Sequence, residues 1–262
     1  MRKVHRFEPC TAHQIYKVNN MNLKVIYEDG SVLVVDKPAG VVVFPEGETR
    51  RVRAGGSKTL IDYLIEQNPE LKNVGEGPRY GVVHRLDKDT SGILLVAKRQ
   101  EALIFFQKQF KSREVGKKYT ALATGVFKED SGIIETMISR SPQDPRKQKA
   151  YPIGSEAPKS ARDAITEYKV KEIFEDYTLL DVDIKTGRKH QIRCHLTYIH
   201  HPIAGDKLYG FKDSPTPDGL NRQFLHSSYL KIKLPNGNIK EFESDLPKEL
   251  KMVLEEINPA KQ

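Results

Sequence analysis

Most apolar segments of this chain are short, rich in β-branched residues and arranged in hairpin-like pairs. Two of them, 164–174 and 177–184, are separated only by Glu175 and Asp176, which fits a hairpin turn. Further strand-like patterns lie at 31–36, 41–44, 93–97, 119–123 and 224–234, and helical spacing is found at 59–67, 99–113, 186–199 and 247–257. Because strands outnumber helices and do not alternate with them, the pattern predicts an α+β fold with a mixed, mainly antiparallel sheet flanked by helices and loops.

The length of 262 residues fits one large domain or two intimate subdomains, at roughly 150 residues per domain. Residues 1–22 are polar and aperiodic, and we expect an N-terminal arm or an extended segment lying on the body. The body is expected to span 23–257, followed by a short tail at 258–262.

Apolar runs such as Ile93–Ala97 are far shorter than the ~20 residues that a membrane-spanning helix needs. The basic N-terminus is not followed by the apolar stretch of a secretory signal. Two cysteines, Cys10 and Cys194, are too few for a disulfide scaffold. We therefore expect a cytoplasmic protein that does not enter a membrane.

Positive charge is concentrated in two segments that turn residues mark as surface loops. The chain has 43 Lys and Arg against 35 Asp and Glu, a formal net charge of +8. The basic residues of the two segments are Arg50, Arg51, Arg53 and Lys58 in the first, and Arg140, Arg146, Lys147 and Lys149 in the second. Such clusters favour a polyanionic partner, although solvated loop charge with no partner is the alternative.

A cluster of polar side chains at 84–92 lies immediately before the apolar run Ile93–Ala97. It supplies an imidazole, a guanidinium, carboxylates and hydroxyls directly before the start of an expected buried strand. The alternative is a turn capped by Asp87 and Thr90, with its charges in solvent.

A second cluster spans 185–195, where Ile192, Leu196 and Ile199 form an apolar helical stripe. Arg193 is next to that stripe, so its guanidinium should lie at the edge of the core and need an anionic partner, which Asp87 or Asp89 could supply. Metal binding is the rival interpretation, because His190 and Cys194 are four residues apart. Without CxxC or HExxH spacing, no metal site is expected.

Lys117, Lys118 and Tyr119 enter the strand-like pattern at 119–123. A tyrosine in a strand is most often a core residue whose hydroxyl reaches the rim. On its own, this third cluster does not indicate a function.

Five segments, in order and with fitting spacing, resemble the motifs of the RluA-type pseudouridine synthases. They lie between about residues 25 and 235, which is most of the chain. The segments are Asp36–Gly40, His84–Lys98, Lys117–Ala121, Thr186–Leu196 with Pro202–Asp206, and Leu225–His226. The resemblance implies the pseudouridine synthase fold, with 23–257 as the catalytic domain, and the isomerisation of uridine in RNA to pseudouridine.

The resemblance also implies roles for individual residues. Asp87 matches the essential catalytic carboxylate, Arg193 the arginine that pairs with it, and Tyr119 the active-site tyrosine. A carboxylate suits this chemistry because breaking the glycosidic bond develops positive character at C1′, as in retaining glycosidases. Both a covalent sugar adduct and a glycal intermediate remain open. The same resemblance suggests an RNA- or substrate-binding set of His84, Arg85, Thr90, Lys117, Arg188, His190, Gln191 and Leu225.

The expected partner is RNA, either large-subunit ribosomal RNA or tRNA, bound by a monomer without metal or organic cofactor. Many family members carry an S4-type RNA-binding domain before the catalytic part, and we expect none here. The alternative function is an inactive RNA-binding protein on the same scaffold. A hydrolase using His84, Asp87 and Ser91 would lack the Gly-x-Ser-x-Gly elbow.

Overall fold

The computed structural model describes residues 15–18, 21–45 and 58–259. Its strands are β1 Ile15–Val18, β2 Met21–Glu28, β3 Val32–Lys37, β4 Ser91–Ala97, β5 Gly116–Thr124, β6 Ser131–Arg140, β7 Gln148–Pro152, β8 Arg162–Ile173, β9 Tyr177–Ile184, β10 Leu225–Lys233 and β11 Ile239–Glu243. Its helices are α1 Leu60–Gln67, α2 Gln100–Ser112, α3 Gln191–Tyr198 and α4 Lys248–Glu256, with a 3₁₀ helix, η2, at Pro69–Asn73.

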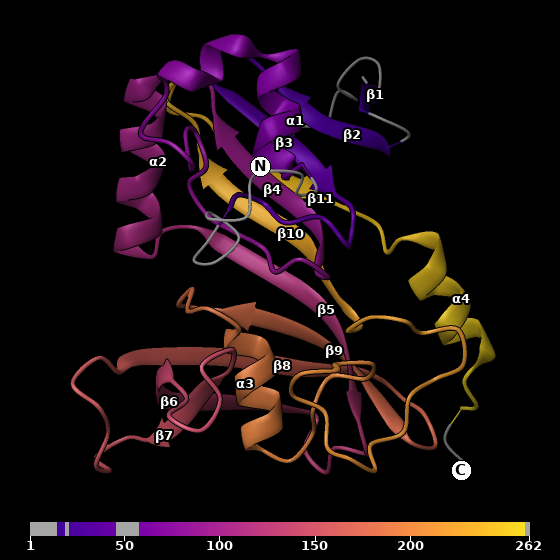
Figure 1. The fold of residues 1–262 in the computed structure, drawn as a ribbon. Helices are drawn as coiled ribbons and strands as arrows, with labels where there is room; N and C mark the ends of the chain where they lie inside the picture. Colours follow the sequence, from indigo (N-terminus) through magenta and orange to yellow (C-terminus); the bar gives the residue numbers. More distant parts are fainter. Residues whose placement is uncertain (1–14, 19–20, 46–57, 260–262) are drawn as a thin grey trace, which may run out of the picture.

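The described strands form one sheet in the order β1-β2-β3-β4-β10-β5-β9-β8-β6-β7, and β11 pairs with β10. Every pairing between strands is antiparallel except that of β4 with β10. The predicted α+β fold with a mainly antiparallel sheet is therefore confirmed. Figure 1 shows β1–β4 with α1 and α2 in one half and β6–β9 with α3 in the other, joined where β10 meets β5.

Strands β3 and β4 are buried on both faces, which explains their nearly unbroken apolar sequences. Successive side chains of a strand point to opposite faces. Leu33 and Leu94 accordingly pack in the same core cluster as Leu60 of α1, whereas Val34 and Leu95 pack in a second cluster with Phe106 of α2. The two helices thus hold β4, which directly follows the 84–90 loop, and its neighbour β3.

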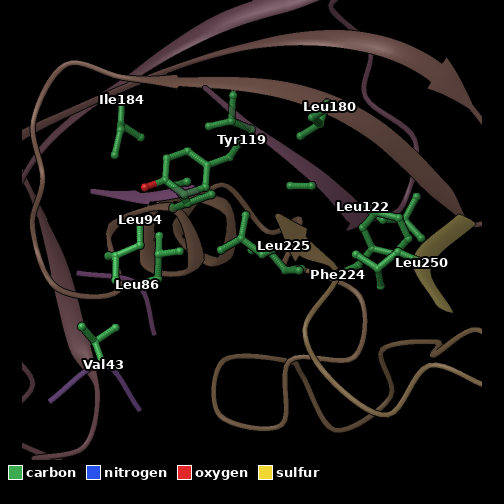
Figure 2. Close-up of a cluster of buried hydrophobic side chains, with 14 of the residues drawn as sticks. Val43, Leu86, Leu94, Tyr119, Leu122, Leu180, Ile184, Phe224, Leu225 and Leu250 are labelled. Atoms are coloured by element: carbon green, nitrogen blue, oxygen red, sulfur yellow. The ribbon is translucent and has the colours of Figure 1, made fainter. Parts of the chain in front are cut away.

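The first of these two clusters, which holds Leu33, Leu94 and Leu60, extends to Tyr119 of β5. Figure 2 shows its ring among Leu86, Leu94, Ile184 and Leu225, all of which belong to one buried cluster. This cluster brings the 84–90 loop together with the end of β9 and the start of β10.

Several expected boundaries are wrong. Residues 41–44 are not a strand, because the carbonyls of Val42 and Val43 instead accept hydrogen bonds from the first amides of α1. Helix α3 begins at Gln191 rather than at 186, and His190 precedes it in the left-handed conformation at φ 54°. His190 and Cys194 therefore do not share a helix face as the metal interpretation assumed.

The second basic segment is a β-hairpin rather than a loop. Arg140 is the last residue of β6 and Lys149 lies in β7, so only 141–147 form the connecting tip. In the first segment, Arg50, Arg51 and Arg53 lie outside the described residues, as does Cys10. Of the predicted N-terminal arm, 15–18 form β1 and 21–22 are the first residues of β2, with which β1 pairs.

Within the described ranges, no helix is long and apolar enough to span a membrane. In the same ranges, no three His, Cys, Asp or Glu side chains gather in a way that could hold a metal ion.

Candidate active site

The 84–90 loop carries Asp87 and enters β4 through a close backbone contact. Gly92 has φ 111°, and a Cβ atom there would lie 2.2 Å from the carbonyl oxygen of Ser227 in β10. Only glycine fits this left-handed position and this close approach. The loop is closed by a hydrogen bond from the Thr90 amide to the Asp87 carbonyl (3.2 Å).

Arg193 joins two carboxylates that come from different parts of the chain. Its Nη1 donates to Asp87 Oδ2 at 2.8 Å. Its Nε and Nη2 donate to both oxygens of Asp206, at 2.6 and 2.9 Å. The side chains of Arg193 and Asp206 are buried, and that of Asp87 is 16% exposed. The predicted partner of Arg193 is thus Asp87 and not Asp89, with Asp206 as a second one.

Electrostatics favour the charged forms of Arg193 and Asp206. Burial lowers the pKa of Arg193, but the hydrogen bonds and charges of Asp206 and Asp87 outweigh it, and the net shift is upward. Burial raises the pKa of Asp206, but Arg193 and the amides of Leu208 and Tyr209 reverse the shift, and the net direction is downward. The guanidinium is therefore a fixed positive charge against Asp87.

His190 faces the other oxygen of Asp87. Its Nε2 lies 3.8 Å from Asp87 Oδ1, and its Nδ1 lies 3.0 Å from the Tyr209 hydroxyl. That hydroxyl accepts the amide of Gln148 at 2.5 Å and so has its own proton to donate to Nδ1. Burial lowers the pKa of His190 to about 4, so the ring is neutral at pH 7 with its proton on Nε2, toward Asp87.

A small cavity of about 60 Å³ lies between Asp87, Thr90, Tyr119, Arg193 and Leu225. Burial raises the pKa of Tyr119 to about 12, the nearby Asp87 charge adds to this shift, and a hydrogen bond with Ser227 opposes it. Tyr119 therefore keeps its phenolic proton at neutral pH. The cavity is lined on one side by apolar residues such as Leu225 and on the other by polar side chains that include Asp87, Tyr119 and Arg193.

Two wider cavities flank the small one and share Arg85, Asp87 and His190 with it. One, of about 440 Å³, is lined by the basic residues Arg79, Arg85, Lys111, Arg113, Lys117, Lys185, Arg188 and Lys189, and Asp87 is the only acid among its described lining residues. The other, of about 690 Å³, is lined by the basic residues Arg85, Lys88, Arg146, Lys189, Arg193, Lys207 and Arg222, with His190, Asp87 and Asp89. An excess of cations in both cavities suits a phosphate backbone.

Three residues of the predicted binding set use their polar atoms within the protein. The Nε2 of His84 accepts the amide of Leu95 at 3.0 Å, and its ring stacks on Phe110. All four hydrogen-bonding positions of the Gln191 amide are occupied, by partners at residues 165, 166, 186 and 188. The hydroxyl of Thr90 accepts from Gln223 at 2.9 Å. These side chains hold the walls of the site in place.

The predicted cationic members of that set line the 440 Å³ cavity. Burial lowers the pKa of Lys117 to about 8. Arg188 donates from Nε to the Asp163 carbonyl at 2.9 Å, and Arg85 lies over the ring of Phe44 at 5.5 Å. Their binding roles stay predictions.

Sequence reasoning missed the roles of Asp206, Tyr209 and Lys37. Asp206 lies in a motif that was recognised, Pro202–Asp206, but nothing local indicated that it pairs with Arg193. The Tyr209 ring lies 4.9 Å from the guanidinium of Arg193, and no sequence signal singled it out. Lys37 is fully buried and donates to the carbonyls of Pro38, Val41 and Lys88, at 2.8, 2.9 and 3.0 Å.

Similarity to known proteins exists in both sequence and fold. A sequence profile described as RNA pseudouridylate synthase matches residues 31–198. The chain is 41% identical over 207 residues to a protein of Aquifex aeolicus named uncharacterized RNA pseudouridine synthase; the match includes 78% of this chain and 61% of that protein. It is 38% identical over 251 residues to ribosomal large subunit pseudouridine synthase D of Nitrosomonas europaea; the match includes 93% of this chain and 68% of that protein.

In fold, the chain is similar to human RNA pseudouridylate synthase domain containing 1, with a TM-score of 0.70 and 26% identity. That alignment covers 92% of this chain and 89% of the human one.

Proposed function

This chain belongs to the RNA pseudouridylate synthase family, and from that premise we propose that it isomerises uridine in RNA to pseudouridine, with Asp87 as the reacting carboxylate. The family inferred from the five motifs is confirmed, and its members are isomerases.

The proposal depends above all on the geometry around Asp87. One oxygen, Oδ2, is held by Arg193 at 2.8 Å. The other, Oδ1, accepts no hydrogen bond from the described part of the chain and has His190 Nε2 at 3.8 Å. We therefore assign Oδ2 to the ion pair and Oδ1 to the sugar carbon C1′ of the target nucleotide.

In the reaction, the N1–C1′ bond of uridine breaks and a C5–C1′ bond forms. A carboxylate oxygen stabilises the positive character that develops at C1′. The proton displaced from C5 goes to solvent and N1 takes one up, so substrate and product have the same composition. Tyr119 and Leu225 line the small cavity that would retain the detached uracil while it turns.

The target base has to leave its stack to reach Asp87, because Asp87 lines a small cavity and an enzyme that acts on a base takes it out of the stack into such a pocket. We propose that the neighbouring nucleotides of the strand occupy the two wider cavities, the preceding one on one side and the following one on the other. Lys117 and Arg188, which line the 440 Å³ cavity, would contact phosphate there. Arg85 lines all three cavities, so the everted base would pass beside it on its way to Asp87.

Large-subunit ribosomal RNA is the RNA class we propose as substrate. The Nitrosomonas relative, at 38% identity, carries that specificity in its name. Transfer RNA, the other class inferred from sequence, is the second substrate to test. Asp87, Tyr119 and Arg193 meet around one cavity, and this arrangement does not favour the inactive RNA-binding alternative.

The experiment uses transcripts labelled with tritium at uridine C5, because the displaced proton carries the label into water. Wild-type protein should release tritium from a large-subunit ribosomal RNA transcript, and Asp87→Asn should release none above background. A matched control is Asp181→Asn, which removes a carboxylate that is 44% exposed and pairs with Lys171 on β8. Release by Asp87→Asn at the wild-type rate would disprove the role of Asp87, and release from tRNA alone would reassign the substrate.

A further inference from the structure

Arg222, in the loop before β10, extends back to the catalytic loop although the two are far apart in sequence. Its Nη1 donates to the carbonyl of Asp89 at 3.0 Å, and its Nη2 donates to the hydroxyl of Ser91 at 3.0 Å. Its side chain is 12% exposed. A guanidinium has five donors in a rigid fork, so it can bind several acceptors at once without losing its charge.

The same guanidinium also holds the strand that carries Leu225. Nη1 lies 3.1 Å from the carbonyl of Gln223 and 3.3 Å from that of Leu225. Arg222 therefore connects two walls of the small cavity, the loop with Asp87 and the start of β10 with Leu225. It does not line that cavity itself.

Two consecutive carbonyls directly after Asp87 accept hydrogen bonds from buried or nearly buried basic side chains. Lys37 donates to the Lys88 carbonyl at 3.0 Å, and Arg222 binds the next one, that of Asp89. The amide of Gly40 also donates to the Lys88 carbonyl, at 2.9 Å. The loop is thus held by β3 and by the segment before β10, and β3 and β10 are the strands that pair with β4.

We propose that Arg222 is a positioning residue that sets the place of Asp87 relative to the sugar of the target uridine. It acts through the Asp89 carbonyl and the Ser91 hydroxyl. The inference rests on the proposed isomerisation. Reacting groups have to be aligned closely, and a misplacement of about 1 Å reduces a rate by about 100-fold.

The test compares Arg222→Met, Arg222→Lys and the matched control Glu249→Gln. Met keeps most of the apolar length but no donor, and Lys keeps a charge but not the fork. Glu249→Gln removes the ion pair at 3.1 Å, on a carboxylate that is 57% exposed, and leaves the bonds of Arg222 to the loop. Turnover of C5-labelled RNA gives kcat and KM, and thermal unfolding and circular dichroism report the folded fraction.

Arg222→Met should lower kcat about 100-fold per folded molecule and leave KM within about twofold, because RNA binding does not depend on the exact place of Asp87. The kcat of Arg222→Lys should lie between those of Arg222→Met and the wild type. The kcat and KM of Glu249→Gln should equal those of the wild type. If Arg222→Met does not fold, Arg222→Lys tests the proposal in its place, and it should likewise lower kcat while leaving KM nearly unchanged.

Two results would overturn the proposal. One is a kcat within twofold of wild type in the folded variants. The other is a rise in KM at constant kcat, which would mean that Arg222 contacts RNA from the 690 Å³ cavity. Failure of the proposed function looks different, because wild-type protein would then release no tritium from any RNA.

Discussion

Arg193 binds two carboxylates at once, and only a guanidinium has the geometry to do so. Two of its nitrogens bind Asp206 and a third binds Asp87. The backbone amides of Leu208 and Tyr209 both donate to Asp206, at 2.9 and 3.0 Å, and so fix it in turn. The guanidinium that faces Asp87 is therefore bound by a carboxylate that two backbone amides hold in turn.

Replacing Arg193 by Leu should abolish turnover and destabilise the fold. It leaves Asp206 buried without its counter-charge, and breaking one side of a buried ion pair typically costs about 3–5 kcal/mol. Urea unfolding measures the loss of stability, and tritium release measures turnover. Arg193→Lys keeps one charge but cannot bridge both carboxylates, so its stability should be intermediate. A folded Arg193→Leu protein with near-normal turnover would contradict the role we give to this pair.

At the scale of elements, the β6–β7 hairpin brings positive charge to the 690 Å³ cavity. Arg146, at its tip, lines that cavity and is paired with Asp144 at 2.7 Å, while remaining 76% exposed. Lys147 lies over the Tyr209 ring, and Lys149 of β7 lies over that of Tyr151. The hairpin is thus linked to the ion-pair network through Tyr209.

Neutralising Arg146, Lys147 and Lys149 to Gln should weaken RNA binding and flatten its dependence on salt. Each phosphate contact that is lost should reduce the slope of log K against log salt concentration by about 0.7–0.9. Because Asp144 already offsets part of the charge of Arg146, we expect the slope of log K against log salt concentration to change by about 1 to 2 in total. Fluorescence anisotropy over a salt series measures it.

The matched control replaces Lys231, Lys240 and Lys248, which lie in β10, in β11 and at the start of α4 and line none of the three cavities. Their replacement should leave the slope close to that of the wild type. If the two triple variants have equal slopes, the hairpin does not bind phosphate.

At the scale of the whole molecule, two buried histidines, His195 and His226, connect strands of the sheet, and two half-buried histidines lie beside the site. His195 of α3 bonds to Thr136 of β6 and Thr166 of β8, at 2.9 and 2.8 Å. His226 lies at the parallel contact of β10 with β4, 2.9 Å from Ser91. The other two, His84 and His190, border the site.

Stability should fall as pH drops below about 6.5, the usual pKa of histidine in an unfolded chain. Burial lowers the pKa of His84 to about 3 and those of His190 and His195 to about 4, and it also lowers the pKa of His226. Between these values and about 6.5 the unfolded chain binds more protons, so each histidine reduces the unfolding free energy by up to about 1.4 kcal/mol per pH unit.

Urea unfolding at pH 7.5, 6.5 and 5.5 measures this slope. His195→Gln can still bond to both threonines but cannot titrate. The unfolding free energy of this variant should therefore change less steeply with pH, by the contribution of about one proton. The exposed His200, replaced by Asn to suit its φ of 66°, is the matched control and should leave the slope unchanged. A slope in His195→Gln equal to that of wild type would contradict the assignment.

The sequence by itself determined the fold class, the family and the need of Arg193 for an acidic partner, and the family resemblance singled out Asp87 for that partner. Short apolar runs rich in β-branched residues, turn residues and the apolar stripe of 192, 196 and 199 depend only on neighbours along the chain. Arg193 could be matched to an acid because a guanidinium beside that stripe needs a counter-charge.

Only the tertiary structure decided which groups complete the site. Asp206 is 13 residues from Arg193, and Arg222 is 133 residues from the carbonyl that it binds. The start of α3 was missed because the side chain of Gln191 ties 186–190 into a loop through contacts with β8. Such hydrogen bonds depend on where distant segments meet after folding, and no local pattern of residues encodes that distance or direction.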